Sequence, residues 1–255
     1  MISPDMPTAL ITGTSSGLGR ALAELLGNRG WAVCGCSRRG CDLPNVKDRI
    51  CDLTDAAAVP ATLTGLLTGV DRLELVVLNA GVLGEIGLLT ETPLAELKAV
   101  MDINLWANKT VMDWLHAWGR PVDQVIMMSS GAAVLGNKGW GGYGLSKAAL
   151  NMLAKLYAHE FPGTHIAALA PGIIDTAMMD HLCDEADAAA FPALQRLRDA
   201  RGTDAMPDPK TAAARILSVL ERLRDWPSGA FVDIREILDP DAHARLYRPV
   251  DARTR

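Results

Sequence analysis

The sequence lacks any uninterrupted apolar run near the length of about 18 residues that a membrane-spanning helix requires. Its N-terminal stretch, MISPDMPTALITG, also lacks the basic region followed by an apolar region that marks a secretory signal. The net charge of −5 gives none of the basic excess that nucleic acid or an anionic membrane would attract. These absences predict a cytoplasmic protein that binds neither nucleic acid nor membranes.

Cysteine and histidine are also scarce, with five of each. The cysteines are odd in number and form no C-x-x-C pair, which argues against a disulfide framework, and the histidines form no H-E-x-x-H motif. We therefore assign no metal site and interpret the cysteines as small buried residues. A zinc site built from Cys34, Cys36, Cys41 and Cys51 is the alternative.

Tyrosine is rarer still, with three in 255 residues, yet the stretch YGLSK places Tyr143 four residues before Lys147. In a helix, this spacing puts both side chains on one face, about one turn apart. A nearby cation favours phenolate, so the pKa of the phenol would fall and the group could transfer a proton near neutral pH. The alternative is a half-exposed helix face whose lysine extends into solvent.

Short apolar runs alternate with helical patterns along most of the chain. Runs that are apolar on both faces are typical of buried parallel strands, with helices packed on either side. The sequence therefore predicts an α/β fold, a doubly wound seven-stranded parallel sheet with helices on both faces, in a single domain over residues 1–255. Strands are expected at residues 8–12, 31–37, 49–51, 73–79, 124–130, 165–170 and 229–234.

Helices are expected from Gly17 to about Gly30, over about 54–68, from Pro93 at the first helical position, over about 143–159 and after Asp208-Pro209. Two connections depart from this alternation. Only thirteen residues separate Arg38 from Asp52, which is too short for a full crossover helix and predicts a loop or a single turn. Residues 177–207 form a long amphipathic insertion, which predicts a lid over a substrate.

A glycine-rich loop, TGTSSGLG at residues 12–19, joins the first predicted strand to the first helix. Gly13, Gly17 and Gly19 would permit a tight turn and bring the backbone close to a phosphate at the helix N-terminus. The spacing is G-x-x-x-G-x-G, so the glycines alone leave an ordinary turn open as an alternative. Their position at the first strand-to-helix junction favours a dinucleotide-binding loop.

Further motifs follow this loop, and together they resemble the short-chain dehydrogenase/reductase family. NAG at residues 79–81 follows the fourth predicted strand, MDINL contains Asn104, and Ser130 lies thirteen residues before Tyr143. PGIIDT occupies residues 171–176. Each motif alone fits a turn, a strand end or a helix cap, but their shared order over residues 8 to about 234 favours the functional interpretation. The resemblance implies a Rossmann fold and hydride transfer between a nicotinamide cofactor and a carbonyl or secondary alcohol.

The resemblance also implies a role for each matching residue. Ser130 would donate a hydrogen bond to the carbonyl oxygen and Tyr143 would protonate it. Lys147 would lower the pKa of Tyr143 and bind the nicotinamide ribose, while Asn104 would hold a water that links Lys147 to solvent. The implied cofactor contacts are Gly13, Ser15, Ser16, Gly17, Leu18, Gly19, Ser37, Arg38, Asp52, Leu53, Asn79, Ala80, Gly81, Tyr143, Lys147, Pro171, Gly172, Ile174 and Thr176.

The type of cofactor depends on the end of the second predicted strand. An acidic residue there binds the ribose 2′-hydroxyl of NAD, whereas a basic residue accommodates the 2′-phosphate of NADP. The chain has CSRRG, with Ser37 followed by Arg38 and Arg39 and no acid. NADP(H) is therefore predicted, with a solvated arginine pair as the alternative.

The substrate is less clearly indicated. The last strand reads SGAFVDIRE instead of ending in V-D-G-G, which with the short segment after Arg38 resembles the branch that contains sepiapterin reductase and benzil reductase. This resemblance implies an NADPH-dependent carbonyl reductase for diketone-type substrates. An NAD-dependent alcohol dehydrogenase of the same family and a non-catalytic NADP-sensing protein are the alternatives. Leu135, Trp140, Met178, Met179 and Leu182 are candidates for an apolar substrate pocket.

Two helical stretches, at residues 105–115 and 143–158, carry apolar surface. Family members pair these helices between subunits, so a homodimer or homotetramer is expected. The alternative is that both apolar stripes face their own sheet.

Overall fold

Seven strands form one parallel sheet in the computed structural model, which describes residues 6–180, 182–183 and 189–247. Their order, β3-β2-β1-β4-β5-β6-β7, confirms the doubly wound fold, with the change of direction between β1 and β4. The strands are β1 (Thr8–Thr12), β2 (Ala32–Ser37), β3 (Val46–Ile50), β4 (Leu75–Leu78), β5 (Gln124–Met128), β6 (His165–Ala170) and β7 (Ala230–Asp233).

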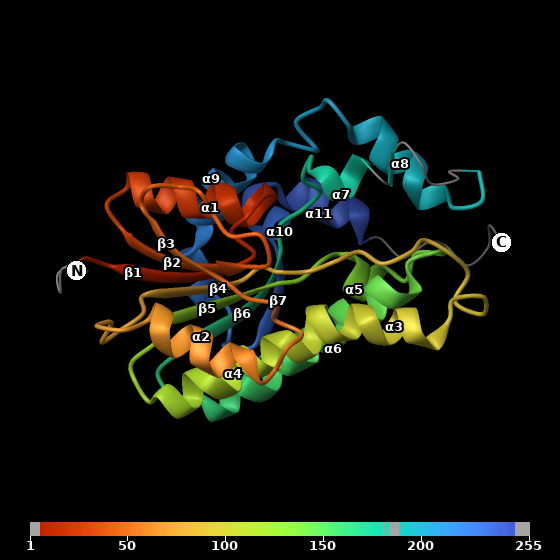
Figure 1. Ribbon diagram of the computed structural model, residues 1–255. Helices are drawn as coiled ribbons and strands as arrows, with labels where there is room; N and C mark the ends of the chain where they lie inside the picture. Colours follow the sequence, from red (N-terminus) through yellow and green to blue (C-terminus); the bar gives the residue numbers. More distant parts are fainter. Residues whose placement is uncertain (1–5, 181, 184–188, 248–255) are drawn as a thin grey trace.

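Helices cover both faces of this sheet (Figure 1). One face carries α1 (Gly17–Asn28) and α9 (Pro209–Val219), and the other carries α2 (Ala58–Leu66), α4 (Ala107–Trp118) and α6 (Gly141–Glu160). The remaining helices are α3 (Leu94–Met101), α5 (Ala132–Leu135), α7 (Ala177–Asp180), α8 (Pro192–Ala200), α10 (Ile234–Leu238) and α11 (Pro240–Leu246), with a π-helical turn at Asp102–Trp106 and a 3₁₀ turn at Arg222–Asp225. Each helix in the described ranges is too short or too polar to cross a membrane.

The alternation of side chains along β1 shows how the strands separate two layers of core. Ala9 and Ile11 pack with α1 and α9, whereas Leu10 packs with α2, α4 and α6, and all three are fully buried. Burial of a leucine or isoleucine side chain such as Leu10 or Ile11 stabilises the fold by about 1.5–3 kcal/mol. The two cores together hold the strands rigidly, so the loops at their carboxyl ends start from fixed positions.

Several predicted boundaries were wrong, because local side-chain contacts decide where elements start. The helix expected over 54–68 begins only at Ala58, since the carboxylates of Asp52 and Asp55 accept hydrogens from backbone N–H groups two or three residues later and hold turns there. β3 starts at Val46 rather than 49, and Pro93 precedes α3 instead of opening it. The loop predicted after Arg38 is confirmed.

Candidate active site

The carboxyl ends of the strands surround a cavity of about 850 Å³. It reaches from the loop after β1 to α8 and α11, which lie beyond the sheet in Figure 1. Three predicted site residues, Gly19, Asp52 and Asn104, do not line it. Those that do are Gly13, Ser15, Ser16, Gly17, Leu18, Ser37, Arg38, Leu53, Asn79, Ala80, Gly81, Ser130, Tyr143, Lys147, Pro171, Gly172, Ile174 and Thr176.

The glycine loop owes its shape to a close approach between backbone and Asn79. A Cβ atom at Gly19 would lie 2.3 Å from the carbonyl oxygen of Gly13 and 2.5 Å from Nδ2 of Asn79, so only glycine fits. Asn79 Nδ2 also donates to the carbonyl oxygen of Thr12 at 3.1 Å. Gly19 therefore packs the loop against β4, while Gly13, with a φ of +79°, faces the cavity.

At the end of β2, the hydroxyl oxygen of Ser37 is buried and has no hydrogen-bond partner among the described residues. Arg38 and Arg39 follow it in the cavity wall, and Arg39 Nη2 donates to the Ser16 hydroxyl at 2.9 Å. Asp52 was expected to contact the cofactor, but its carboxylate accepts from the backbone and hydroxyl of Thr54 and lies outside the cavity. Its neighbours Cys51 and Leu53 line the wall instead.

Helix α6 carries both Tyr143 and Lys147, which line the cavity and lie on one face of the helix, as their spacing predicted. The Lys147 Nζ lies 5.6 Å from the centre of the Tyr143 ring and donates to the main-chain carbonyl of Met128, at the end of β5, at 2.7 Å. Ser130 and Tyr143 both line the cavity here, and the Ser130 hydroxyl acts to lower the pKa of Tyr143. A serine, a phenol and an ammonium thus lie together at the end of one strand.

The protonation of this group differs from the expectation. Burial raises the pKa of Tyr143, and the Ser130 hydroxyl opposes this shift without cancelling it. Burial also lowers the pKa of Lys147 from 10.5 to about 8. The prediction that the pKa of Tyr143 falls was therefore wrong for the protein alone, because the loss of water on burial outweighs the effect of Ser130. Near neutral pH, Tyr143 carries its proton.

Asn104 lies behind the cavity, in the π-helical turn between α3 and α4. Its Oδ1 accepts from the Val82 backbone N–H at 2.8 Å, and its Nδ2 donates to the Val82 carbonyl and the Ser146 hydroxyl. A Cβ at Gly81 would lie 3.1 Å from Asn104 Oδ1 and 3.5 Å from Lys147 Nζ. Asn104 thus joins the loop after β4 to α6. Its Oδ1 accepts one hydrogen bond from the protein and can accept a second, from the water that the resemblance implies.

The far end of the cavity is mostly apolar. Leu135, Trp140, Met178 and Met179 line it as predicted, whereas Leu182 is buried in the cluster behind them. The Nε1 of Trp140 is buried and has no acceptor among the described residues. The predicted lid, residues 177–207, supplies α7 and α8 to this end, and residues 181 and 184–188 lie outside the described residues.

Sequence reasoning missed several residues of this end, namely Asn137, Ile173, Ala193, Arg196, Leu197, Arg235 and Leu246. Arg235 lies in α10, two residues after the end of β7, and its position at the carboxyl end of a strand was the signal that could have found it. Arg196 lies on α8 and had no comparable signal, because the position of the insertion depends on tertiary packing.

The cysteines of the alternative zinc site, Cys34, Cys36, Cys41 and Cys51, do not gather around one point in the described residues. Burial raises the pKa of the Cys34 thiol to about 11 and that of Cys36 to about 12, so both are neutral thiols at neutral pH. Within the described residues, no group of three or more histidine, cysteine or acidic side chains gathers around one point.

Comparison with known proteins shows which family the chain belongs to. The family model for the short chain dehydrogenases matches residues 7–187. The chain belongs to this family. Among its relatives, the sepiapterin reductase of Rattus norvegicus is 32% identical over 89% of this chain and 96% of its own. A benzil reductase ((S)-benzoin forming) of Bacillus subtilis is 29% identical over 91% of this chain and all of its own. A short chain dehydrogenase/reductase from Saccharomyces cerevisiae shares the fold, with a TM-score of 0.78 at 23% identity over 94% of this chain and 99% of its own.

Proposed function

We propose that this member of the family is an NADP(H)-dependent carbonyl reductase that acts on diketone-type substrates. One observation carries the proposal: a single cavity joins the Ser130, Tyr143 and Lys147 group to the unpaired Ser37 hydroxyl and Arg38. The first set fits proton transfer to a reacting oxygen, and the second fits an anion at the adenosine end. The names of the two relatives, sepiapterin reductase and benzil reductase, support a carbonyl substrate.

The residues near the cavity centre suit reduction. A reduced nicotinamide, when bound, supplies a hydride to the carbonyl carbon, and negative charge then develops on the carbonyl oxygen. Ser130 donates a hydrogen bond to that oxygen, and Tyr143 transfers its proton to it. Tyr143 is protonated at neutral pH before the reaction because burial raises its pKa. Below about pH 8, Lys147 is charged and favours the phenolate that remains.

The residues at the opposite end fit a 2′-phosphate. A buried hydroxyl without a partner costs free energy, and a ligand that hydrogen-bonds to Ser37 would remove that cost. Arg38 adds a guanidinium beside it, and no acidic residue among those described lines this end. An acid would be needed there to bind the free 2′-hydroxyl of NAD, so the wall favours NADP(H).

The first experiment compares consumption of NADPH and NADH with vicinal diketones, quinones, pteridines and simple ketones. We expect NADPH oxidation, fastest with a diketone, and at least about tenfold weaker use of NADH, since one charge-assisted contact to the phosphate is lost. Equal use of both cofactors would favour the NAD-dependent alcohol dehydrogenase. NADPH binding without turnover of any carbonyl would favour the NADP-sensing protein.

We further propose a single domain, 1–255, with residues 177–207 as its lid, and a homodimer or homotetramer. The outer surface of α6 exposes Leu145, Met152 and Leu156, each more than half accessible, and Trp106 is half accessible at the start of α4. An apolar surface of this kind is commonly covered by another subunit. Light scattering at micromolar concentration should give a multiple of the 27.2 kDa chain mass, and Leu156→Glu should lower it. A wild-type monomer would contradict the assembly.

A further inference from the structure

The charged side chains that line the cavity all have one sign. Five cations contribute to its wall: Arg38, Arg39, Lys147, Arg196 and Arg235. Among the described residues no aspartate or glutamate lines it, although the chain as a whole has a net charge of −5. Arg38 and Arg39 lie at the adenosine end, and Lys147 at the centre. Arg196 and Arg235 have no part in the proposed cofactor binding or proton transfer, so they are the cations that could bind the substrate.

Arg235 is fixed by a buried carboxylate. Its Nε and Nη2 donate to the two oxygens of Asp233, at 2.8 and 2.6 Å, and its backbone N–H donates to the same residue at 3.0 Å. The Tyr247 hydroxyl donates to Asp233 Oδ2 at 2.8 Å. Asp233 is 1% exposed and lies at the end of β7, so the guanidinium is held in one orientation by a rigid strand.

This arrangement leaves one edge of the guanidinium open. Asp233 takes the edge formed by Nε and Nη2, whereas the edge formed by Nη1 and the second hydrogen of Nη2 has no acceptor among the described residues. That remaining edge carries two parallel N–H groups, the geometry that a carboxylate accepts with both of its oxygens. The pairing with Asp233 therefore orients Arg235 without using up its capacity to bind.

The open guanidinium lies next to the reaction centre. A Cβ placed on Gly131, the neighbour of Ser130, would be 3.8 Å from Arg235 Nη2 and 3.3 Å from the Tyr247 hydroxyl oxygen. Arg235 itself lines the cavity, as do Ser130 and Tyr143. A substrate whose carbonyl oxygen contacts Ser130 would have its nearby substituents beside Arg235.

We propose that the natural substrate is a keto acid, whose carboxylate is bound by the open edge of Arg235 while its carbonyl faces Ser130 and Tyr143. This inference rests on the proposed carbonyl reductase activity and changes its substrate class, with a carboxylate in place of the second carbonyl of a diketone. Arg196, on α8, adds a second positive charge to the same cavity and donates to Asn137 Oδ1 at 3.2 Å.

The test measures kcat/KM with NADPH for keto acids that have one to four carbons between ketone and carboxylate, each compared with its methyl ester. Esterification removes the charge and keeps the carbonyl. For at least one chain length, the wild type should prefer the acid by about tenfold or more, the value of one charge-assisted pair. In the double variant Asp233→Asn/Arg235→Met the ratio should fall to about one, without leaving a buried carboxylate unpaired. Arg224→Ala, an exposed arginine beside Glu221, should keep the wild-type ratio.

A second measurement needs no turnover. Calorimetry of the protein without cofactor should show phenylacetate binding that exceeds phenylacetamide binding and disappears in the double variant. If esters are reduced as well as acids, the keto acid inference is wrong and the carbonyl reductase proposal stands. If no carbonyl is reduced, the proposed function fails, and equal phenylacetate binding by wild type and double variant would then also overturn the anion site.

Discussion

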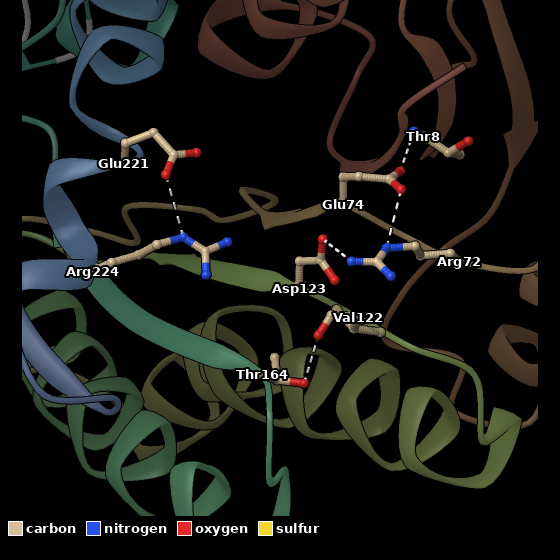
Figure 2. Close-up of polar contacts among 8 residues, drawn as sticks. All are labelled: Thr8, Arg72, Glu74, Val122, Asp123, Thr164, Glu221 and Arg224. Atoms are coloured by element: carbon tan, nitrogen blue, oxygen red, sulfur yellow. Dashed lines mark hydrogen bonds and ion pairs between the residues drawn. The ribbon is translucent and has the colours of Figure 1, made fainter. Parts of the chain in front are cut away.

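The two ends of the sheet differ in whether their polar groups have partners within the protein. At the amino ends of the strands, Arg72 contacts Glu74 at 3.3 Å and Asp123 at 2.6 Å (Figure 2). Glu74 also accepts from the backbone of Thr8 at 2.6 Å, and the Thr164 hydroxyl donates to the carbonyl of Val122 at 2.7 Å. Each side chain here is partnered by another part of the protein, so this end ties the strands together.

At the carboxyl ends, groups are left without protein partners. Ser37 Oγ and Trp140 Nε1 are buried and unpaired among the described residues. The buried Lys147 ammonium lies over the Tyr143 ring and donates to the Met128 carbonyl, with no carboxylate partner among these residues. Leaving a buried polar group unsatisfied costs about 1–3 kcal/mol. These unsatisfied groups mark the carboxyl ends of the strands as the candidate binding site. Substitutions at the carboxyl ends should therefore change binding and turnover, whereas a substitution at the amino ends should not.

The largest effect is expected for Tyr143→Phe, which keeps the ring and removes the proton. Turnover should fall by at least about 10²-fold, the low end for loss of a positioned acid. Cofactor affinity should change little, because the phenol adds less to binding than the phosphate contacts do. Steady-state kinetics with the best carbonyl and NADPH titration by fluorescence measure the two quantities. Near-normal turnover would remove Tyr143 from the mechanism.

Arg38→Ala should act on the cofactor alone. Loss of a charge-assisted contact to the 2′-phosphate should weaken NADP binding by about 1.5–3 kcal/mol and leave NAD binding nearly unchanged. Arg29→Ala is the matched control, since Arg29 is an exposed arginine at the C-terminal end of α1. Equal losses for both cofactors would contradict the assignment of Arg38.

The sequence was sufficient for the architecture because its signals are local and repeated. The apolar runs at 8–12 and 165–170 match β1 and β6, and Asp208-Pro209 marks the start of α9, where the Asp208 carboxylate accepts from the next two N–H groups. The boundaries that failed depend on competition between neighbours. The turns at Asp52 and Asp55 delay α2, and the exposed edge strand β3 has too few buried residues to show a clear pattern.

The site was predicted less completely than the fold. Tyr143, Lys147 and Ser130 could be predicted because each lies in a short motif of the sequence. The structure brings the three residues together in one cavity. Charge states depend on burial, which spacing does not reveal, so the direction of the tyrosine shift was missed. Arg235 was missed because no motif contains it. Which of its N–H groups remain free depends on the contact with Asp233, which only the structure shows.

Lys147→Met should change the pH dependence of stability. In the folded protein burial lowers the pKa of Lys147 to about 8, against 10.5 for a lysine in water, so the unfolded chain holds more protons between these values. The contribution of Lys147 to the free energy of unfolding should therefore rise from about pH 8 to pH 10.5, by at most about 3 kcal/mol, and be lowest below pH 8. This rise should be missing in the variant. The buried thiols of Cys34 and Cys36, whose pKa values are raised, act in the opposite direction above about pH 9 in both proteins, so the comparison with the variant isolates the lysine. Urea unfolding at pH 7, 8, 9 and 10 measures the difference between the two proteins, and a difference that is constant with pH would exclude the shifted lysine.

The smallest effect is expected at the amino end, for Arg72→Ala. Arg72 is 55% exposed and its partners Glu74 and Asp123 remain in contact with water, so loss of the ion pairs should cost no more than about 1 kcal/mol. The KM for NADPH and the turnover should stay at wild-type values, because these ion pairs lie at the opposite ends of the strands from the cavity. Arg38→Ala is the matched comparison, since it removes an exposed arginine from the other end. A loss of stability above about 2 kcal/mol, or a changed KM, would show that the strands transmit changes from one end to the other and that the two ends are not independent.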